Sequence, residues 1–311
     1  HRSMIFSLIA NLAEVNKDEE KIGKKAAKNE CTFYIIEEPE LFLHPNHQVY
    51  FRNKLEEISN LSDAQVIITS HSPYFLNHVR KYSQVKRVYM EGIVSRVAQV
   101  KDNEIDQMCR DNGILMAEAK NECLSKKMTG EALIAEQDKI TASDHLRYIL
   151  WIDPTRANAF LSQKVILVEG PTEKALFSFL LSNPKGAFYD NSGAAKITVI
   201  DTVGKYHFYK FAKLLDRFGV KVWCVHDTDS DRNSKEVSHK KINEIVASLV
   251  GEKIVEDILC LEPNLETSLG LTKGQNPDVD LYVNLENNEK NCLSSDCYIR
   301  IINFVKNAME A

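Results

Sequence analysis

The chain has 311 residues, 44% hydrophobic and 27% charged, which is enough for about two globular domains and argues against bulk disorder. Its 39 basic and 44 acidic residues give a net charge of −5, which excludes a protein that holds nucleic acid by bulk positive charge. No apolar run reaches the roughly 18 residues that cross a membrane, and the seven scattered cysteines include no Cys-x-x-Cys pair. We therefore expect a cytoplasmic protein with reduced cysteines and no membrane partner.

The first part of the chain predicts a strand, helix, strand crossover. The sequence begins at His1 inside an apolar-periodic helix, so we expect a fragment of a longer protein. The apolar run Cys31–Ile36 predicts a buried strand, and Val66–Thr69 predicts a second. A helix is predicted between them, with apolar side chains on one face at Val49, Phe51, Leu55 and Ile58. Strands joined in this way are parallel neighbours.

The remainder predicts a connector and a second parallel sheet. Alternation from 86 to 100 favours one or two strands, and residues 102–163 are polar and helix-favouring. Four short apolar strands then alternate with amphipathic helices, which is typical of a parallel α/β sheet. The strands are predicted at 164–168, 197–201, 221–225 and 257–261, the helices from 172, at 206–217, at 237–250 and from about 296.

Polar side chains follow both strands of the first crossover. Glu37 and Glu38 come directly after the first strand, and His71 follows the second. Ligands of an open parallel sheet bind at this edge, where Glu37 could hold Mg²⁺, Glu38 could orient a water, and His71 could sense a γ-phosphate. Paired acids after a strand are equally typical of a solvated turn.

The combined pattern is more specific than its parts. Glu-Glu-Pro-Glu, Leu-His-Pro with His44, and Ser-His-Ser-Pro resemble the Walker B motif, D-loop and switch histidine of ABC-type ATPases, especially the RecF and structural-maintenance-of-chromosomes branch. The resemblance implies paired heads that sandwich ATP, with His44 near the seam and His71 at the nucleotide. No Gly-x-x-x-x-Gly-Lys-Ser/Thr occurs in these residues, so we expect inefficient ATP hydrolysis by this polypeptide alone.

A second group of acids follows strands of the predicted second sheet. Glu169 ends one strand, Glu173 lies in the first turn of the next helix, and Asp227 and Asp229 end another strand. On an extended segment Asp227 and Asp229 would point to one side. Converging carboxylates repel one another unless Mg²⁺ or Mn²⁺ neutralises them, and two such ions serve phosphodiester hydrolysis. Taken alone, the Asp-rich segment is also typical of a turn or helix cap.

This second group, with Gly204 in the turn between its strands, resembles the Toprim fold of topoisomerases, primases and related nucleases. An ABC-type head joined to a Toprim domain resembles the overcoming-lysogenisation-defect (OLD) family of nucleases, which includes the nuclease subunit of the Gabija anti-phage system. The resemblance implies metal binding by Glu169, Glu173, Asp227 and Asp229. It also implies a further acid, for which Glu266 is the candidate and Glu262 the competitor, and a lysine that steadies transition-state charge, for which Lys273 is the candidate.

The predicted fold class is therefore α/β. We expect the C-terminal part of an ABC-type ATPase domain at 1–101, a helical connector or dimerisation region at 102–163, and a Toprim nuclease domain at 164–311. Glu169, Asp227, Glu38, His71 and Lys273 are the predicted catalytic residues.

The predicted function is a Mg²⁺- or Mn²⁺-dependent DNA endonuclease or nickase, linked to an ABC-type ATPase that uses ATP and Mg²⁺ in the full-length protein. The resemblance implies DNA as substrate, a homodimer or higher homo-oligomer, a role in anti-phage defence, and a helicase-like protein as a candidate partner. One alternative is an ABC-type ATPase whose inactive Toprim domain docks a partner. Another is a primase- or topoisomerase-like enzyme, although none of the eleven tyrosines has a context that supports catalysis.

Overall fold

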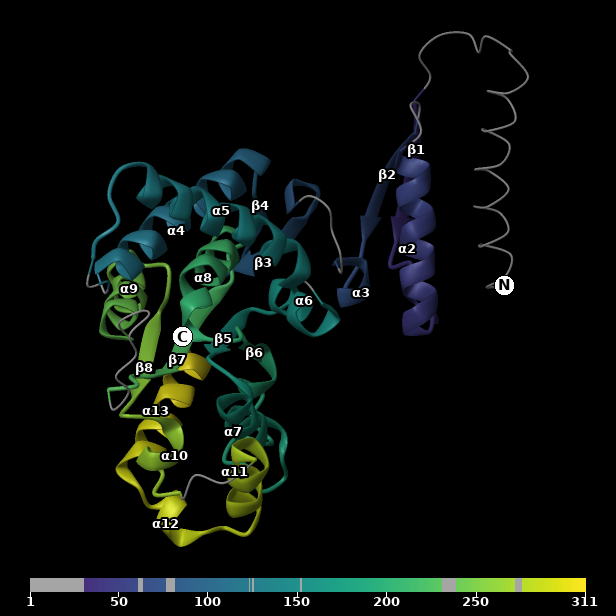
Figure 1. The fold of residues 1–311 in the computed structure, drawn as a ribbon. Helices are drawn as coiled ribbons and strands as arrows, with labels where there is room; N and C mark the ends of the chain where they lie inside the picture. Colours follow the sequence, from purple (N-terminus) through teal and green to yellow (C-terminus); the bar gives the residue numbers. More distant parts are fainter. Residues whose placement is uncertain are drawn as a thin grey trace. The chain divides into compact units, whose positions relative to one another are not determined.

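The computed structural model describes residues 31–60, 64–76, 82–122, 124, 126–151, 153–230, 239–271 and 276–311. The chain forms two compact units, which divide after residue 77 (Figure 1). The predicted opening helix lies outside the described residues. The predicted α/β fold class is confirmed, and each unit is described separately below.

The first unit has the predicted strand, helix, strand order, but its two strands are not buried as predicted, because alternate residues of each are exposed. Strands β1 (Thr32–Glu37) and β2 (Ala64–Thr69) pair in parallel, so that Glu37 lies opposite Thr69 at the carboxyl end of both. Helix α2 (Pro45–Ser59) connects them, and the short α3 (Pro73–Leu76) follows β2. Apolar side chains spaced along one face of α2 bury themselves against α3 and the strands, in a cluster formed by Phe51, Leu55 and Phe75. This packing places the ends of β1 and β2 side by side.

The second unit begins with a hairpin and three helices. Strands β3 (Lys86–Glu91) and β4 (Val94–Gln99) pair antiparallel, as the alternation predicts. Helices α4 (Asp102–Glu122) and α5 (Glu131–Trp151) pack against each other, and α6 (Pro154–Leu161) leads into the main sheet. Most residues between 102 and 163 are therefore helical.

The main sheet has four parallel strands in the order β6-β5-β7-β8. Their bounds are β5 Lys164–Val168, β6 Ile197–Asp201, β7 Lys221–Asp227 and β8 Asp257–Leu261. The two central strands, β5 and β7, are buried along almost their whole length. Since all four strands run in one direction, the residues that follow them gather at a single edge.

Helices cover both faces of this sheet (Figure 1). Side chains of α7, α11 and α13 join strand residues such as Ile166 and Trp223 in one large apolar cluster. Helix α8 packs on β7 from the opposite face, where the Phe208 and His226 rings are 6.2 Å apart. The remaining helix bounds are α7 Pro171–Ser182, α8 Phe208–Arg217, α9 His239–Gly251, α10 Leu265–Ser268, α11 Pro277–Glu286, α12 Lys290–Leu293 and α13 Asp296–Glu310.

Buried polar contacts join the hairpin and the connector to the sheet. The Arg87 guanidinium of β3 donates to the carbonyl oxygens of Phe160, Ser162, Phe218 and Gly219. The Lys210 ammonium of α8 pairs with Asp144 of α5, both almost wholly buried, and Asp144 also accepts from Asn112 of α4. The hairpin and the helical connector are therefore built into the second unit.

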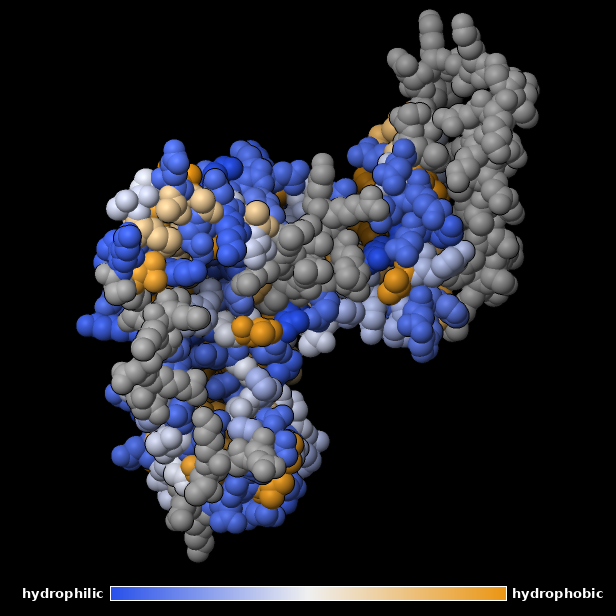
Figure 2. All heavy atoms as spheres, viewed as in Figure 1, coloured by the Kyte–Doolittle hydropathy of each residue, from blue (hydrophilic) through white to orange (hydrophobic). Residues whose placement is uncertain are grey.

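The surface in view in Figure 2 is predominantly hydrophilic, with small hydrophobic areas between. None of the helices in the described ranges combines the length and apolar character that a membrane crossing requires. The described cysteines are all free, and Cys109, Cys224, Cys292 and Cys297 are buried.

Candidate functional site

The first polar cluster lies where β1 and β2 end. Glu37 is the exposed last residue of β1, and Glu38 follows it in a left-handed conformation with φ of 44°. The Nε2 atom of His71 lies 3.3 Å from Oε1 of Glu38, so the structure brings this predicted pair together. His44 instead caps α2, where its Nδ1 accepts from the Asn46 amide at 3.4 Å. Whether His44 also contacts a nucleotide stays a prediction.

Glu40 also belongs to this cluster, although the sequence motifs predict no role for it. Its Oε1 accepts from the Ser70 hydroxyl at 2.8 Å and from the His71 amide at 2.7 Å, and so ties the loop after β1 to the loop after β2. Hydrogen bonding to Glu40 raises the pKa of Glu38. Burial opposes ionisation of Glu40, but hydrogen bonds from the backbone, Ser70 and His71 lower its pKa overall. These hydrogen bonds favour the ionised form of Glu40, which holds the loop after β2 in place.

The second cluster forms at the carboxyl edge of the main sheet. Glu169 follows β5 directly and Asp227 ends the neighbouring β7, and the Asp227 amide donates to Oε2 of Glu169 at 3.4 Å. Oδ1 of Asp227 also accepts from the Leu265 amide at 3.0 Å. Adjacent strands thus bring two carboxylates together that are 58 residues apart in sequence.

Glu173 and Glu266 extend this cluster. Burial raises the pKa of Asp227 to about 8, with further contributions from the charges of Glu173, Glu169, Glu266 and Asp229. Burial likewise raises the pKa of Glu173 to about 7, and Glu169 and Glu266 add to the effect. These acids are therefore close enough to oppose one another's ionisation.

The choice between Glu266 and Glu262 follows from the same interactions. The Glu266 charge acts on both Glu173 and Asp227, whereas the exposed Glu262 acts on Cys260, whose pKa is raised mainly by burial. These electrostatic effects favour Glu266 as the fifth acid of the cluster, and its metal-binding role stays a prediction.

Asp229 does not lie on an extended segment, so that part of the sequence reasoning is wrong. Strand β7 ends at Asp227, and Asp229 adopts a left-handed conformation with φ of 50°, which aspartate tolerates better than most residues. Its Oδ2 lies 2.7 Å from the Lys205 ammonium and 3.3 Å from Nδ1 of His239. The Asp229 carboxylate thus belongs to a buried ion pair, and its predicted role as a metal ligand stays untested.

Lys205 is the residue of this site that sequence reasoning missed. It follows the Gly204 turn, and its buried ammonium also donates to the Asp227 carbonyl at 2.6 Å. Gly204 has a φ of 109°, a backbone conformation that favours glycine. The pair Gly204-Lys205 after β6 was therefore the sequence feature that could have indicated this lysine. The partner acid lies 24 residues further along, and no local pattern reveals that contact.

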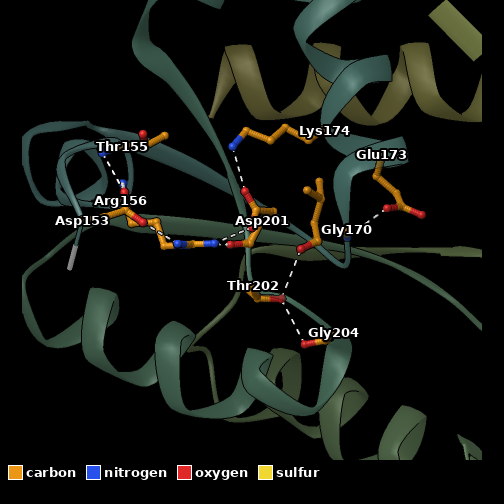
Figure 3. A network of polar contacts seen from close by, with 10 residues as sticks. Asp153, Thr155, Arg156, Gly170, Glu173, Lys174, Asp201, Thr202 and Gly204 are labelled. Atoms are coloured by element: carbon orange, nitrogen blue, oxygen red, sulfur yellow. Dashed lines mark hydrogen bonds and ion pairs between the residues drawn. The ribbon is translucent and has the colours of Figure 1, made fainter. Parts of the chain in front are cut away.

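A neighbouring polar network fixes the loop that carries Lys205 (Figure 3). Asp201 ends β6 and pairs with Arg156 at 2.6 Å and Lys174 at 2.7 Å. The Thr202 hydroxyl lies 3.1 Å from the Val168 carbonyl and 3.1 Å from the Gly204 carbonyl, and the Gly204 amide donates to the Glu169 carbonyl at 2.8 Å. Although Asp201 also ends a strand, its carboxylate is committed to two cations.

The donor set suits a hard divalent cation, because its ligands are carboxylate oxygens that are partly desolvated and repel one another. Among the described residues, no group of three or more His, Cys, Asp or Glu side chains has the arrangement that holds a metal ion. The acids are neighbours rather than a formed coordination sphere. Lys273 lies outside the described residues.

Comparison with known proteins matches both units. Residues 160–229 match the "Overcoming lysogenization defect protein-like, TOPRIM domain" family. The second unit contains an OLD-like Toprim domain. Residues 2–76 match the "AAA ATPase domain" family, so an ATPase fragment precedes the Toprim domain. Together these domain types imply use of a divalent metal and of ATP. The predicted three-part division at 101 and 163 stays a prediction.

Relatives named OLD nuclease and endonuclease GajA confirm the predicted resemblance. The chain is 25% identical over 268 residues to the Old nuclease of Escherichia phage P2, which covers 86% of this chain and 39% of that protein. It is 25% identical to the OLD nuclease of Thermus scotoductus, over 76% of this chain and 40% of the relative. Endonuclease GajA of Bacillus cereus is 22% identical over 81% of this chain and 34% of its own length. The chain thus spans about two fifths of the first two relatives. The matched Toprim segment contains Glu169, Glu173 and Asp227 of the acid cluster.

Proposed function

We propose that this chain is part of an ATPase-linked, metal-dependent DNA endonuclease or nickase, whose Toprim domain cuts phosphodiester bonds. The carrying observation is the convergence of Glu169, Glu173, Asp227 and Glu266 at one edge of the sheet, where burial and mutual repulsion raise the pKa values of the first three. Carboxylates that oppose one another's ionisation are suited to be balanced by divalent cations.

The proposed ions are Mg²⁺ or Mn²⁺, two in number, held by Glu169, Glu173, Asp227 and Glu266, with Asp229 in support. Bound there, they would activate a water and stabilise the leaving oxygen of the phosphodiester. The protein's own contribution is positional. The Leu265 amide orients Asp227, and the Gly170 amide, at 3.0 Å from Oε2, orients Glu173. Lys273 is proposed to steady the negative charge that develops on the phosphate.

The first unit is proposed to supply the nucleotide-dependent part. Glu37 would hold the Mg²⁺ of ATP, Glu38 would orient the attacking water, and His71 would sense the γ-phosphate, with His44 near the nucleotide. The short distance between His71 and Glu38 supports this arrangement. We further propose a cytoplasmic homodimer or higher homo-oligomer that acts in anti-phage defence, with a helicase-like protein as a candidate partner.

The test is cleavage of supercoiled plasmid DNA with added Mn²⁺ or Mg²⁺. We expect the parent chain to convert supercoiled plasmid to nicked circles, and Asp227→Asn to lower the rate by at least about 100-fold, since a carboxylate of the reacting centre is lost. Asp257→Asn is the matched control, because Asp257 begins β8 at the opposite end of the same sheet and is exposed. Equal rates of cutting by Asp227→Asn and the parent would contradict the assignment of Asp227 to the catalytic site. Metal binding without cutting would favour the alternative of a docking platform.

A further inference from the structure

The second unit buries two lysines beside acids, but in different surroundings. Lys205 and Lys210 are both almost wholly buried. Lys210 faces Asp144 of the helical connector, whereas the Lys205 ammonium lies within the carboxylate cluster, 2.7 Å from Asp229 Oδ2. Burying an ammonium group is unfavourable unless a partner charge offsets the loss of water. The buried Lys205 ammonium is therefore stabilised by the carboxylates around it.

The position of Lys205 links three acids of the cluster. Its side chain pairs with Asp229 and donates to the backbone carbonyl of Asp227. Its backbone hydrogen-bonds to Glu169, and its charge, with that hydrogen bond, opposes the rise that burial causes in the pKa of Glu169. One ammonium group thus offsets repulsion at Asp229 and at Glu169.

The chain holds this ammonium rigidly. Lys205 comes directly after the left-handed Gly204, whose amide is bound to the Glu169 carbonyl, and the Thr202 hydroxyl lies in hydrogen-bonding reach of the carbonyls of Val168, at the end of β5, and of Gly204 (Figure 3). The side chain is fully enclosed and its donors point at fixed oxygen atoms. A surface lysine could swing away when a metal arrives, but an enclosed one keeps its charge in the site.

We propose that Lys205 is a built-in cation of the carboxylate site, which permanently balances Asp229 and so sets how strongly the remaining acids attract a divalent metal. The inference rests on the proposed function, because it takes the acid cluster to be the metal site. Lys205 is a positioning residue in this account, since it acts through Asp229, Asp227 and Glu169. It follows that loss of the ammonium makes the site more negative, and loss of Asp229 leaves a positive charge uncompensated.

The experiment measures Mn²⁺ affinity by isothermal titration calorimetry, together with the melting temperature in EDTA and in Mn²⁺, on the whole chain. Lys205→Met keeps the length of the side chain and removes its charge. We expect a lower melting temperature in EDTA, Mn²⁺ affinity about tenfold tighter than in the parent, and a rise in melting temperature on adding Mn²⁺ that exceeds the parent's by roughly 2–4 °C.

Two further variants distinguish charge from general damage. Asp229→Asn should weaken Mn²⁺ binding about tenfold, the opposite direction, and it carries the test if Lys205→Met does not fold. Lys210→Met, the matched control, should lower the melting temperature in EDTA yet leave Mn²⁺ affinity within about twofold, because Lys210 faces the connector.

Unchanged or weaker Mn²⁺ binding by Lys205→Met, or unchanged binding by Asp229→Asn when the lysine variant is unfolded, would overturn the inference and leave the proposed metal site standing. Absence of Mn²⁺ binding by the parent would overturn the proposed function, and the inference with it.

Discussion

At the scale of single residues, the protonation of Asp227 and Glu173 connects the fold to metal binding. Their pKa values of about 8 and about 7 lie above the 3.9 and 4.3 typical of these groups in an unfolded chain. The folded state therefore holds extra protons between pH 4 and 8. Their contribution to the stability of the metal-free protein is fully present below about pH 4 and is lost as the pH rises through 7 to 8.

This protonation predicts a pH-dependent metal affinity. Because a cation must displace these protons, we expect Mn²⁺ affinity to rise from pH 6 to pH 8 and to level off above it, with proton release on binding at pH 7 and little at pH 9. Calorimetry in two buffers of different ionisation heat measures the released protons. Asp227→Asn should release fewer protons at pH 7. Proton release that is the same at pH 7 and pH 9 would contradict these pKa shifts.

At the scale of elements, Arg87 ties the β3–β4 hairpin to other parts of the second unit. Arg87 donates to four backbone carbonyls at 2.6–3.0 Å, and its guanidinium lies 4.8 Å from the centre of the Tyr89 ring. Arg87→Met leaves these carbonyls without their donor, so we expect the free energy of unfolding of the second unit to fall by about 3 kcal/mol. Urea unfolding followed by tryptophan fluorescence measures it.

Arg96 is the matched control on the same hairpin. Its guanidinium pairs with Glu91 at 2.8 Å, but both side chains are more than half exposed, so Arg96→Met should cost less than about 1 kcal/mol. Equal losses for the two variants would show that Arg87 does not anchor the hairpin.

Elements with a local signal could be predicted from the sequence. Strands β5, β6 and β8 have the predicted bounds, because each is a short apolar run closed by polar residues. The contacts of Glu40 and Lys205 could not be predicted, since their partners lie 31 and 24 residues away and meet through strand pairing. The predicted direction of the Asp229 side chain is wrong because side chains two residues apart point to the same side only in an extended strand. Strand β7 ends at Asp227, before Asp229.

At the scale of the whole molecule, the acids and the ATPase-like motifs belong to different compact units. Both tryptophans of the chain, Trp151 and Trp223, fall in the second unit, and Trp223 is buried in its main apolar cluster. Tryptophan fluorescence therefore reports the unfolding of the second unit alone, whereas circular dichroism at 222 nm reports helices of both. The two signals together allow each unit to be followed in the intact chain.

This separation predicts that damage to the core of the first unit spares the proposed metal site. Leu55 is 4% exposed and packs with Phe51 and Phe75, so Leu55→Ala should destabilise the first unit by about 2–5 kcal/mol. We expect an early loss of circular dichroism on heating, with the fluorescence transition and its shift by Mn²⁺ unchanged. Leu176→Ala, a truncation in the main cluster of the second unit, should instead lower the fluorescence transition. A fluorescence transition that falls with Leu55→Ala as far as the circular dichroism does would mean that the units unfold as one, and that the ATPase-like part supports the Toprim site through the fold itself.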